Sequence, residues 1–502
     1  MDYKFNLMNS YNITNKLKII DFKAYWMGVA GVVILQLIMA MQNLTTHWLA
    51  DQSNLAQHFL YFHDWFFYGP YFSGTSPIVF GLGPVATFLF SFPGMLGFSP
   101  DVMHRFVIII NTLGIVAIAW SLRQKHSERT LFFIFSLLLF FAHRYWWILT
   151  IFWINSLLVA LSLFFISSMI NHFKNPKLNS LLILVSLSVL PLHIHSTPSF
   201  VLPVTIYAIV YYFLHVRKWE ALRLYTWALW GITFLPLFLG ELMNGFYNTR
   251  AIFQNIRGKT DHAAGIISGK QALDSFFIHN NIQFSWFSAK DYGNINTWIG
   301  IILVLFVLWY IIFAVRQNDE RNWHRHFWRC FPFVMVFHFL FFYVFNRPIV
   351  SGHYLSFSTV FYVLPLGLII NSILSKLKLN SVIVLFLVVL WITLGQSFHS
   401  EREKDYWNYE EIKEILLDTS METNSLCTIE GPHFSVVPGK KYNSVEYLLR
   451  RGLIKGISYN PESSFCLYVN RSGDTPDEIV SKNATFRLLR RTGKAGLYTK
   501  KD

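Results

Sequence analysis

The sequence predicts an all-α polytopic membrane bundle followed by a small C-terminal α/β domain, and three observations lead to this fold class. Of the 502 residues, 53% are apolar and 18% aromatic, with a mean hydropathy of +0.38; soluble domains average about 45–50% apolar residues. Apolar runs close to the length of a bilayer-spanning helix recur over most of the chain. The last hundred or so residues instead show short strand-like runs between turn residues.

Twelve apolar segments are candidate membrane spans. They cover residues 25–42, 78–97, 106–122, 130–142, 148–170, 179–191, 199–215, 223–241, 297–315, 329–345, 354–375 and 380–397. We expect the short ones to be longer helices whose ends are polar. The first segment follows a mixed stretch with four lysines and no convincing small-residue cleavage site, so an uncleaved anchor is expected.

Basic residues are distributed unevenly between the connections. Eighteen Lys and Arg residues lie in the N-terminal stretch and in connections 123–129, 174–177, 217–223, 316–329 and 376–378, against eight in the intervening connections. Cytoplasmic connections carry the excess of Lys and Arg, so this set is expected in the cytoplasm together with the N-terminus. The formal net charge of +14 therefore reflects membrane topology, and nucleic-acid binding is not expected.

This assignment requires one of the first three segments not to cross the membrane. The N-terminus and connection 123–129 are both expected inside, yet 25–42, 78–97 and 106–122 separate them. Segment 78–97 is interrupted by Gly and Pro, which suits a re-entrant or in-plane helix buried in protein. About eleven transmembrane helices follow. The alternative is that 78–97 is a true span with an atypical charge pattern.

The chain divides into a transmembrane part, 1–397, with outer loops 43–105 and 242–296, and an extracytoplasmic domain, 398–502. The domain begins with a stretch of helical spacing and continues with the runs SLCTIEG, FSVVPG, SSFCLYVN, TFRLLRRT and GLYTK, which predict a small α/β or α+β fold. Cys427 and Cys466 both lie in this part and would pair in an oxidising space; the alternative is two buried free thiols.

Loop 43–105 holds the first candidate for chemistry. Its stretch 42–77 has no Lys or Arg, is rich in aromatic and His residues, and contains two acids, Asp51 and Asp64. A carboxylate at the mouth of a membrane protein is costly to desolvate, which makes it a functional candidate. Asp51 is suited to act as a general base. The alternative is that it caps a helix beginning at Gln52.

Three arginines stand alone in the short outer connections. Arg105, Arg144 and Arg347 each lie at a helix end, where reaching the interface or setting topology is the ordinary role. The alternative is that at least one of them binds a phosphate, since charge-assisted guanidinium bonds are strong. His353 and Tyr354 add hydrogen-bond donors close to Arg347.

Other polar residues fall at further outer positions. His193 and His195 form a His-x-His pair that, with Asp51, could hold a divalent cation, although hydrogen-bonded histidines are commoner. Glu241 lies at the outer end of a span. It is either a second acid of the site or a helix-end residue that reaches water.

The layout resembles the GT-C superfamily of polyprenyl-phosphate-sugar-dependent glycosyltransferases, which includes the protein O-mannosyltransferases and the lipid A aminoarabinose transferases. Members carry an acidic pair early in the first outer loop, then a Pro-containing segment, then an Arg at the outer end of the next span. The matching positions here are Leu49-Ala50-Asp51-Gln52, Asp64-Trp65, Gly69-Pro70, Thr75-Ser76-Pro77 and Arg105. Gln52 departs from the acidic pair, which puts a two-acid mechanism in doubt. The resemblance covers residues 1–400 and is most specific in 45–110.

The resemblance implies a GT-C-like fold and a glycosyltransferase of the bacterial inner membrane, with the N-terminus cytoplasmic and the C-terminal domain periplasmic. The donor would be a sugar linked to polyprenyl phosphate, and the acceptor a periplasmic glycan, lipid or protein such as O-antigen, lipid A or a surface protein. Membrane lipids surround it, and no nucleic acid is involved. The only cofactor considered is a divalent cation.

The resemblance also implies a single inverting displacement, with Asp51 and Arg105 at the family's site positions, and the chemistry of the other outer residues gives them expected roles in it. Asp51 is expected to be the catalytic base. Arg105, Arg347 and Arg144 are expected to bind the donor phosphate. The residues expected to bind the acceptor or the sugar are Asp64, Glu241, His193, His195, His353 and Tyr354.

Three other functions remain open from the sequence. A polymerase or ligase of surface polysaccharide would use Arg250, Arg257 or His262 of loop 242–296 instead of Asp51. A lipid or solute transporter would carry charged residues near the middle of its spans, whereas the spans here are nearly free of them, His338 being a rare polar exception. A non-catalytic scaffold would leave the outer acids and arginines without a role.

Overall fold

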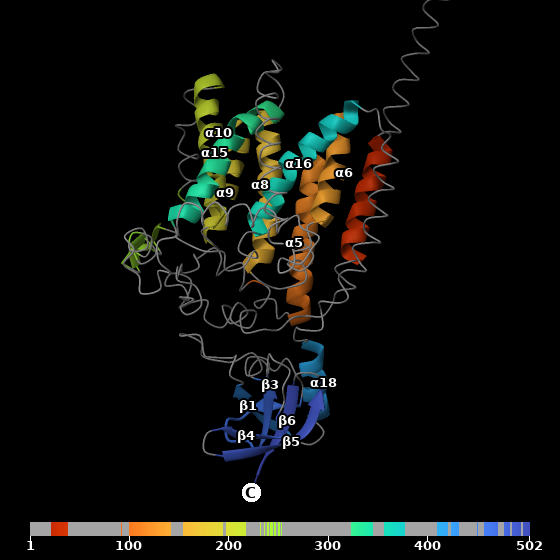
Figure 1. Ribbon diagram of the computed structural model, residues 1–502, viewed down its shortest axis with the longest axis vertical. Coiled ribbons are helices and arrows are strands. Elements are labelled where there is room, and N and C mark those ends of the chain that lie inside the picture. The colour runs from red at the N-terminus through yellow and green to blue at the C-terminus, as the bar shows by residue number, and fades with distance from the viewer. Residues whose placement is uncertain are drawn as a thin grey trace, which may run out of the picture.

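A computed structural model describes residues 22–38, 100–141, 154–193, 197–216, 323–344, 356–376, 409–419, 423–430, 456–469, 476–481, 484–492 and 495–501, with a few further positions at 92, 231–253 and 449. Two parts are seen in Figure 1: a bundle of helices, and a sheet formed by the C-terminal residues.

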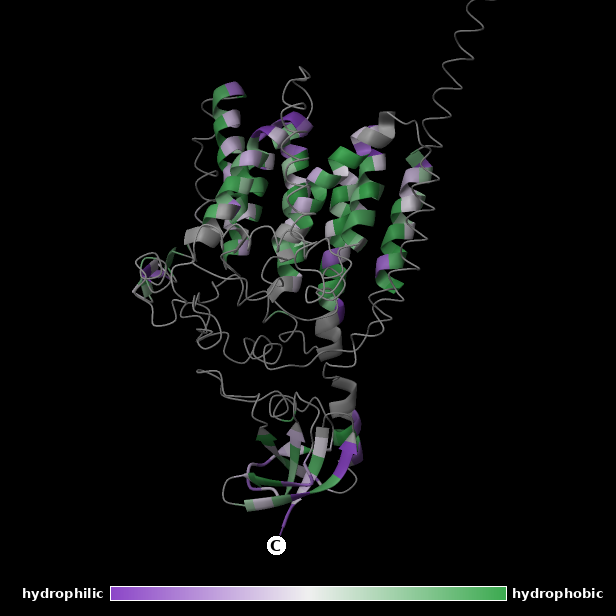
Figure 2. Ribbon diagram, viewed as in Figure 1, coloured by the Kyte–Doolittle hydropathy of each residue, from purple (hydrophilic) through white to green (hydrophobic). Residues whose placement is uncertain are grey.

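The bundle consists of helices that match predicted apolar segments. They are the helix Phe22–Ile38, α5 (Pro100–Ser121), α6 (His126–Phe141), α8 (Ile154–Lys174), α9 (Leu178–Val189), α10 (Leu202–His215), α15 (Trp323–Val344) and α16 (Ser356–Lys376). Figure 2 shows that these helices are predominantly hydrophobic. Segments 78–97, 223–241, 297–315 and 380–397 lie outside the described residues, apart from single positions. The number of spans and the re-entrant segment therefore stay predictions.

One described helix, Ser156–Lys174, is long and apolar enough to cross a membrane by length and composition. Its mean hydropathy is 1.7 over the best window, and most of that window is buried inside the protein. Five shorter apolar helices accompany it. A helix needs about 20 residues to cross the hydrocarbon layer, and Ser156–Lys174 is close to that length.

Small and polar residues join α5 to α8. Gly114 of α5 lies against Leu163 so closely that a Cβ on the glycine would be 2.8 Å from the leucine Cβ. Asn111 Nδ2 donates to the Ser156 carbonyl across the same interface at 3.2 Å. Close approach at small residues and side-chain hydrogen bonds between helices are the usual forces of association in a membrane, where no hydrophobic effect drives helices together.

The chain between α9 and α10 does not form a simple surface turn. Two 3₁₀ turns, η1 (Leu190–His193) and η2 (Thr197–Val201), connect the two helices. α9 has 12 residues, which extend about 18 Å at 1.5 Å per residue. The expectation that the short segments are longer helices holds for α6, which extends back to His126. It is wrong for α9, which ends at Val189 and is followed by the two 3₁₀ turns.

The C-terminal residues fold as the predicted mixture of helix and strands. α18 (Tyr409–Thr419) precedes a six-stranded sheet with the order β2-β1-β3-β6-β5-β4. β1 (Ser425–Glu430) pairs in parallel with β2 (Ser458–Tyr459) and β3 (Phe465–Val469), and β4 (Glu478–Ser481), β5 (Ala484–Thr492) and β6 (Ala495–Lys500) pair antiparallel. β2 and β4 were not predicted, and the run FSVVPG lies outside the described residues.

A buried core holds this sheet together. Leu467, Leu497 and Tyr498 are fully buried, and Leu416 of α18 is buried as well. The Tyr498 hydroxyl donates to the Pro476 carbonyl at 2.6 Å, and burial raises the pKa of Tyr498 to about 12. The domain boundary at 398 and the periplasmic location stay predictions.

Cys427 of β1 and Cys466 of β3 form a disulfide, which resolves the alternative left open by the sequence. Disulfides persist in oxidising compartments and are rare in the cytosol. The bridge therefore supports an extracytoplasmic location for the sheet.

The disulfide gives a direct test of that location. In the full-length protein, denatured directly in the presence of a maleimide, we expect one thiol per chain to react before reduction and three after it. The thiol expected to react before reduction is that of Cys330, which is buried and forms no disulfide. A Cys330→Ser variant should show none before reduction and two after it. Three reactive thiols in the unreduced wild type would place the sheet in a reducing compartment.

Candidate functional site

The connections of the bundle gather at two ends. We call one the Arg105 end; it contains the start of α5 and α8, the η1–η2 turn, the last residue of α15 and the first of α16. We call the other the Lys174 end; it contains the end of α5, α8 and α10 and the start of α15 (Figure 1). The predicted outer connections fall at the Arg105 end. Which end faces the cytoplasm stays a prediction.

Arg105 is exposed and lies in the second turn of α5. The helix Phe22–Ile38 packs antiparallel along α5, because Tyr25 Oη donates to the Ala119 carbonyl at 2.6 Å and Gln36 Nε2 donates to Thr112 Oγ1 at 3.3 Å. This register sets Ile38 level with the residues just before Thr112, so Arg105 extends about 7 Å further along the axis. Arg105 thus lies where the loop that carries Asp51 leaves the first helix.

Phe200 of η2 lies deeper in the bundle than the start of α8. Ser162 Oγ, eight residues into α8, donates to the Phe357 carbonyl near the start of α16 at 3.1 Å. Phe200 of η2 is buried and its ring packs against Phe357 with centroids 5.9 Å apart. Eight helical residues correspond to about 12 Å. Phe200 therefore lies about that distance below the start of α8.

Protein surrounds Phe200 of η2, as non-helical backbone at membrane depth requires. Phe200 stacks on the imidazole of His338 with centroids 4.6 Å apart, and His338 Nδ1 lies 2.9 Å from the Tyr362 hydroxyl. His338 and Tyr362 come from α15 and α16, so the turn is held between both helices. The sequence flagged His338 as an exception without giving it a role. Tyr362 carried no signal in the sequence.

His193 is the last residue of η1, which precedes η2 in the same connection. His195 lies outside the described residues. His193 is thus at the Arg105 end of the bundle. Among the described residues, no group of three His, Cys, Asp or Glu side chains could hold a metal ion. The cation site that combines His193 and His195 with Asp51 stays a prediction.

Glu241 stabilises the turn that follows it in the chain. Its carboxylate accepts hydrogen bonds from the main-chain N–H and the hydroxyl of Thr249, at 3.0 and 2.8 Å. The intervening chain reverses through Gly245 and Phe246, which both have positive φ, and the Arg250 guanidinium donates to the Gly245 carbonyl. This carboxylate therefore closes a loop of about ten residues, and its predicted part in sugar binding stays a proposal.

Seven predicted site residues lie outside the described residues, so their positions relative to Arg105 stay predictions. They are Asp51, Asp64, Arg144, His195, Arg347, His353 and Tyr354.

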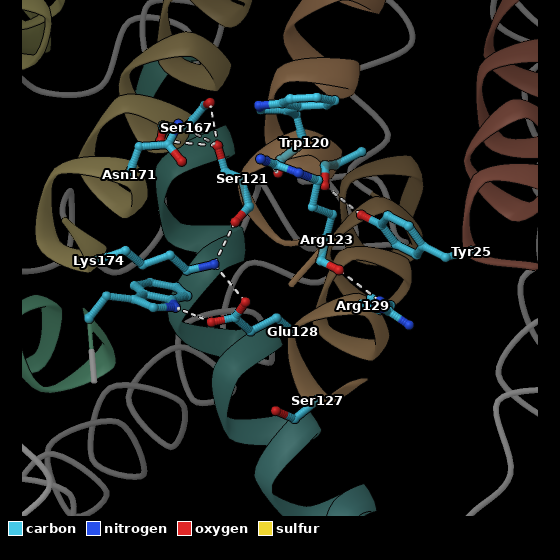
Figure 3. Close-up of polar contacts among 12 residues, drawn as sticks. Tyr25, Trp120, Ser121, Arg123, Ser127, Glu128, Arg129, Ser167, Asn171 and Lys174 are labelled. Carbon is cyan, nitrogen blue, oxygen red and sulfur yellow. Dashed lines mark hydrogen bonds and ion pairs between the residues drawn. The ribbon is translucent and has the colours of Figure 1, made fainter. Parts of the chain in front are cut away.

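A polar network at the Lys174 end was not predicted (Figure 3). Lys174 Nζ donates to the Glu128 carboxylate at 2.6 Å and to the Ser121 carbonyl at 2.5 Å. Trp323 Nε1 donates to the other oxygen of Glu128 at 3.2 Å. Asn371 Nδ2 donates to the Ser127 carbonyl at 3.0 Å. Glu128 is buried, and this network ties the α5–α6 connection to α8, α15 and α16.

The comparisons with known proteins concern the fold. No protein-family model matches the chain, and no curated protein matches it. The chain is similar to the crystal structure of ArnT from Cupriavidus metallidurans bound to undecaprenyl phosphate, with a TM-score of 0.51 and 11% identity over 94% of this chain and 97% of that one. It is also similar to the apo state of the same protein, with a TM-score of 0.39 and 11% identity over 95% and 98% of the two chains. The second similarity is too weak to support an argument.

ArnT is a GT-C lipid A aminoarabinose transferase and a polytopic membrane protein. The resemblance inferred from the sequence is therefore confirmed at the level of the fold, and the chain has the architecture of a membrane bundle. An identity of 11% shows a shared fold and leaves the activity to be argued from the site.

Proposed function

We propose that this chain is an integral-membrane glycosyltransferase that moves a sugar from a polyprenyl-phosphate carrier to an acceptor outside the cytoplasm. The observation that carries the proposal is the fold shared along 94% of the chain with ArnT, whose structure holds undecaprenyl phosphate. The position of Arg105 supports it, because an exposed cation lies at the end of the bundle where the loop with Asp51 both begins and ends.

The proposed reaction is a single inverting displacement. Asp51 accepts the proton of the acceptor hydroxyl, and the hydroxyl oxygen attacks the anomeric carbon from the face opposite the lipid phosphate. The new carbon–oxygen bond forms as the bond to the phosphate oxygen breaks. The lipid phosphate leaves with the bonding electron pair, and Arg105, with Arg347 and Arg144, would stabilise its charge.

The η1–η2 turn suits this chemistry. A glycosyl donor must be kept from water, because water competes with the acceptor for the anomeric carbon. Phe200 of η2 lies about 12 Å below the start of α8, and His193 ends η1 in the same connection. We propose that this turn, with His195, His353 and Tyr354, forms the deep side of the sugar site, while Asp64 and Glu241 contact the acceptor from the outer side.

Arg105→Gln is expected to raise the KM for the donor about 10- to 100-fold, because a hydrogen bond to a charged group contributes about 1.5–3 kcal/mol. Membranes containing the variant would be assayed for transfer from labelled undecaprenyl-phosphate sugar at increasing donor concentration. Arg123→Gln is the matched control, since Arg123 lies at the opposite end of the bundle over the Trp120 ring. Equal donor KM for wild type and Arg105→Gln would remove Arg105 from the donor site.

The same assay distinguishes the proposed glycosyltransferase from a polymerase or ligase. That function would depend on Arg250, Arg257 or His262 and would use a lipid pyrophosphate donor. Arg250 is already bonded to the Gly245 carbonyl within its own turn. We therefore expect Arg250→Gln to lower transfer less than Arg105→Gln does. The acceptor class, whether O-antigen, lipid A or protein, would be read from the product that carries the label.

A further inference from the structure

A cluster of basic side chains lies between α10 and α15 at the Lys174 end. Arg325 and Arg329 are one helical turn apart on α15. His215 of α10 lies near the His326 ring between them, because Tyr211 contacts both rings. All of these groups are basic. Arg329 also lies against the hydroxyl of Tyr207 on α10.

No described carboxylate balances this cluster. The only acidic residue in the described helices at this end is Glu128, and its two oxygens are bonded to Lys174 and Trp323. The buried Nε of Arg325 has no hydrogen-bond partner. Arg329 is exposed. An unpartnered buried donor beside an exposed guanidinium points to a negatively charged ligand, since an unsatisfied buried charged group is costly.

Aromatic side chains fix the cluster in place. His326 is buried, its Nδ1 lies 3.0 Å from the Tyr207 hydroxyl, and its ring stacks on Phe173 of α8 with centroids 5.2 Å apart. The Tyr211 ring lies 4.4 Å from the His326 ring and stacks on His215 at 5.0 Å. The basic groups are therefore presented by a packed interface between helices.

An apolar stripe runs away from Arg329 along the same face of α15. Phe333, Val336, Phe337 and Leu340 follow at helical spacing and are 66%, 58%, 39% and 43% exposed. A parallel stripe on α10 consists of Ile206, Val210 and Leu214, which are 60%, 48% and 65% exposed. Exposed apolar side chains in a membrane bundle face the acyl chains of lipids.

We propose that Arg325 and Arg329, with Tyr207 and His215, bind the phosphate headgroup of an anionic phospholipid whose acyl chains lie along the α10 and α15 stripes. The observation that favours a lipid over a soluble phosphate is the continuity of the two features. The basic side chains lie at the Lys174 end of the two apolar stripes. A phospholipid has the same arrangement, with its phosphate at one end of its acyl chains. This site is at the opposite end of the bundle from the proposed donor site.

The test uses the full-length protein in a mild non-ionic detergent and native mass spectrometry with added dioleoyl phosphatidylglycerol or dioleoyl phosphatidylcholine. Wild type is expected to bind phosphatidylglycerol at least about tenfold more tightly than phosphatidylcholine. Arg325→Gln/Arg329→Gln is expected to bind phosphatidylglycerol about 30-fold more weakly, since each Lys or Arg near a membrane surface contributes about 1 kcal/mol. Millimolar inorganic phosphate is expected to leave the bound lipid in place.

Two further variants make the test decisive. Arg325→Lys/Arg329→Lys keeps both charges and should retain most of the phosphatidylglycerol binding, and it covers the case in which the Gln variant does not fold. Arg123→Gln removes a basic residue at the same end and should bind as wild type does. Four results would each overturn the proposal. They are equal affinity for both lipids, undiminished binding by a folded Gln variant, loss of binding in the Lys variant, and displacement of the lipid by inorganic phosphate. Sugar transfer is measured separately and does not decide it.

Discussion

Asp51→Asn is expected to lower the rate of sugar transfer about 10³-fold, because a positioned general base contributes about 10²- to 10⁴-fold to such a reaction. Asn keeps the size of the side chain and cannot accept the proton of the acceptor hydroxyl. The measurement is the initial rate of transfer from labelled undecaprenyl-phosphate sugar, with the amount of protein in each membrane preparation determined separately. The donor KM should change little, since the carboxylate acts on the acceptor.

Asp101→Asn is the matched control for this prediction. Asp101 is another acid at the Arg105 end, in the first turn of α5, and has no assigned part in the reaction. Its substitution should leave transfer within a few-fold of wild type. If Asp51→Asn transfers the sugar as fast as wild type, Asp51 is not the base and the mechanism proposed here is wrong.

Glu128→Ala is expected to destabilise the protein by about 3–5 kcal/mol, since removing one partner of a buried ion pair leaves the other charge uncompensated. Glu128 is buried, accepts from Lys174 at 2.6 Å, and also accepts from Trp323. Its loss would leave Lys174 and the Trp323 N–H without this acceptor at the place where α6, α8 and α15 meet. Thermal unfolding of the detergent-solubilised protein measures the effect.

Glu128→Leu/Lys174→Met tests whether the loss of stability comes from an uncompensated buried charge. Replacing both members of a buried pair by apolar residues is often close to neutral, so the double variant should be more stable than Glu128→Ala. Arg490→Ala is a second control, because its ion pair with Asp418 is exposed on both sides and contributes at most about 1 kcal/mol. A Glu128→Ala variant as stable as wild type would show that the network in Figure 3 does not hold the helices together.

The sequence predicted the described helices well because hydropathy and length alone define them. α5, α8 and α16 each begin and end within about six residues of the predicted segments, and the polar start of α6 was anticipated. The mixed nature of the C-terminal part was also predicted, because β1, β3, β5 and β6 are long runs. β2 and β4 are two and four residues long, too short for an alternating pattern to be recognised.

The features that depend on tertiary contacts could not be predicted. Glu128 and Lys174 are 46 residues apart, and no local pattern links them. The depth of Phe200 could not be predicted, because it depends on contacts with Phe357 and His338 in distant helices. Of the predicted site residues, Arg105, His193 and Glu241 fall within the described geometry. The roles of all ten residues remain predictions.

The most direct measurement of the central claim is the stoichiometry of the reaction catalysed by the purified full-length protein. Doubly labelled donor, with one label in the sugar and one in the lipid, would be supplied with an envelope acceptor. The account predicts one molecule of undecaprenyl phosphate released for each sugar transferred, at the anomeric configuration opposite to that of the donor. Release of undecaprenyl pyrophosphate, or movement of intact labelled lipid without transfer of the sugar, would contradict it.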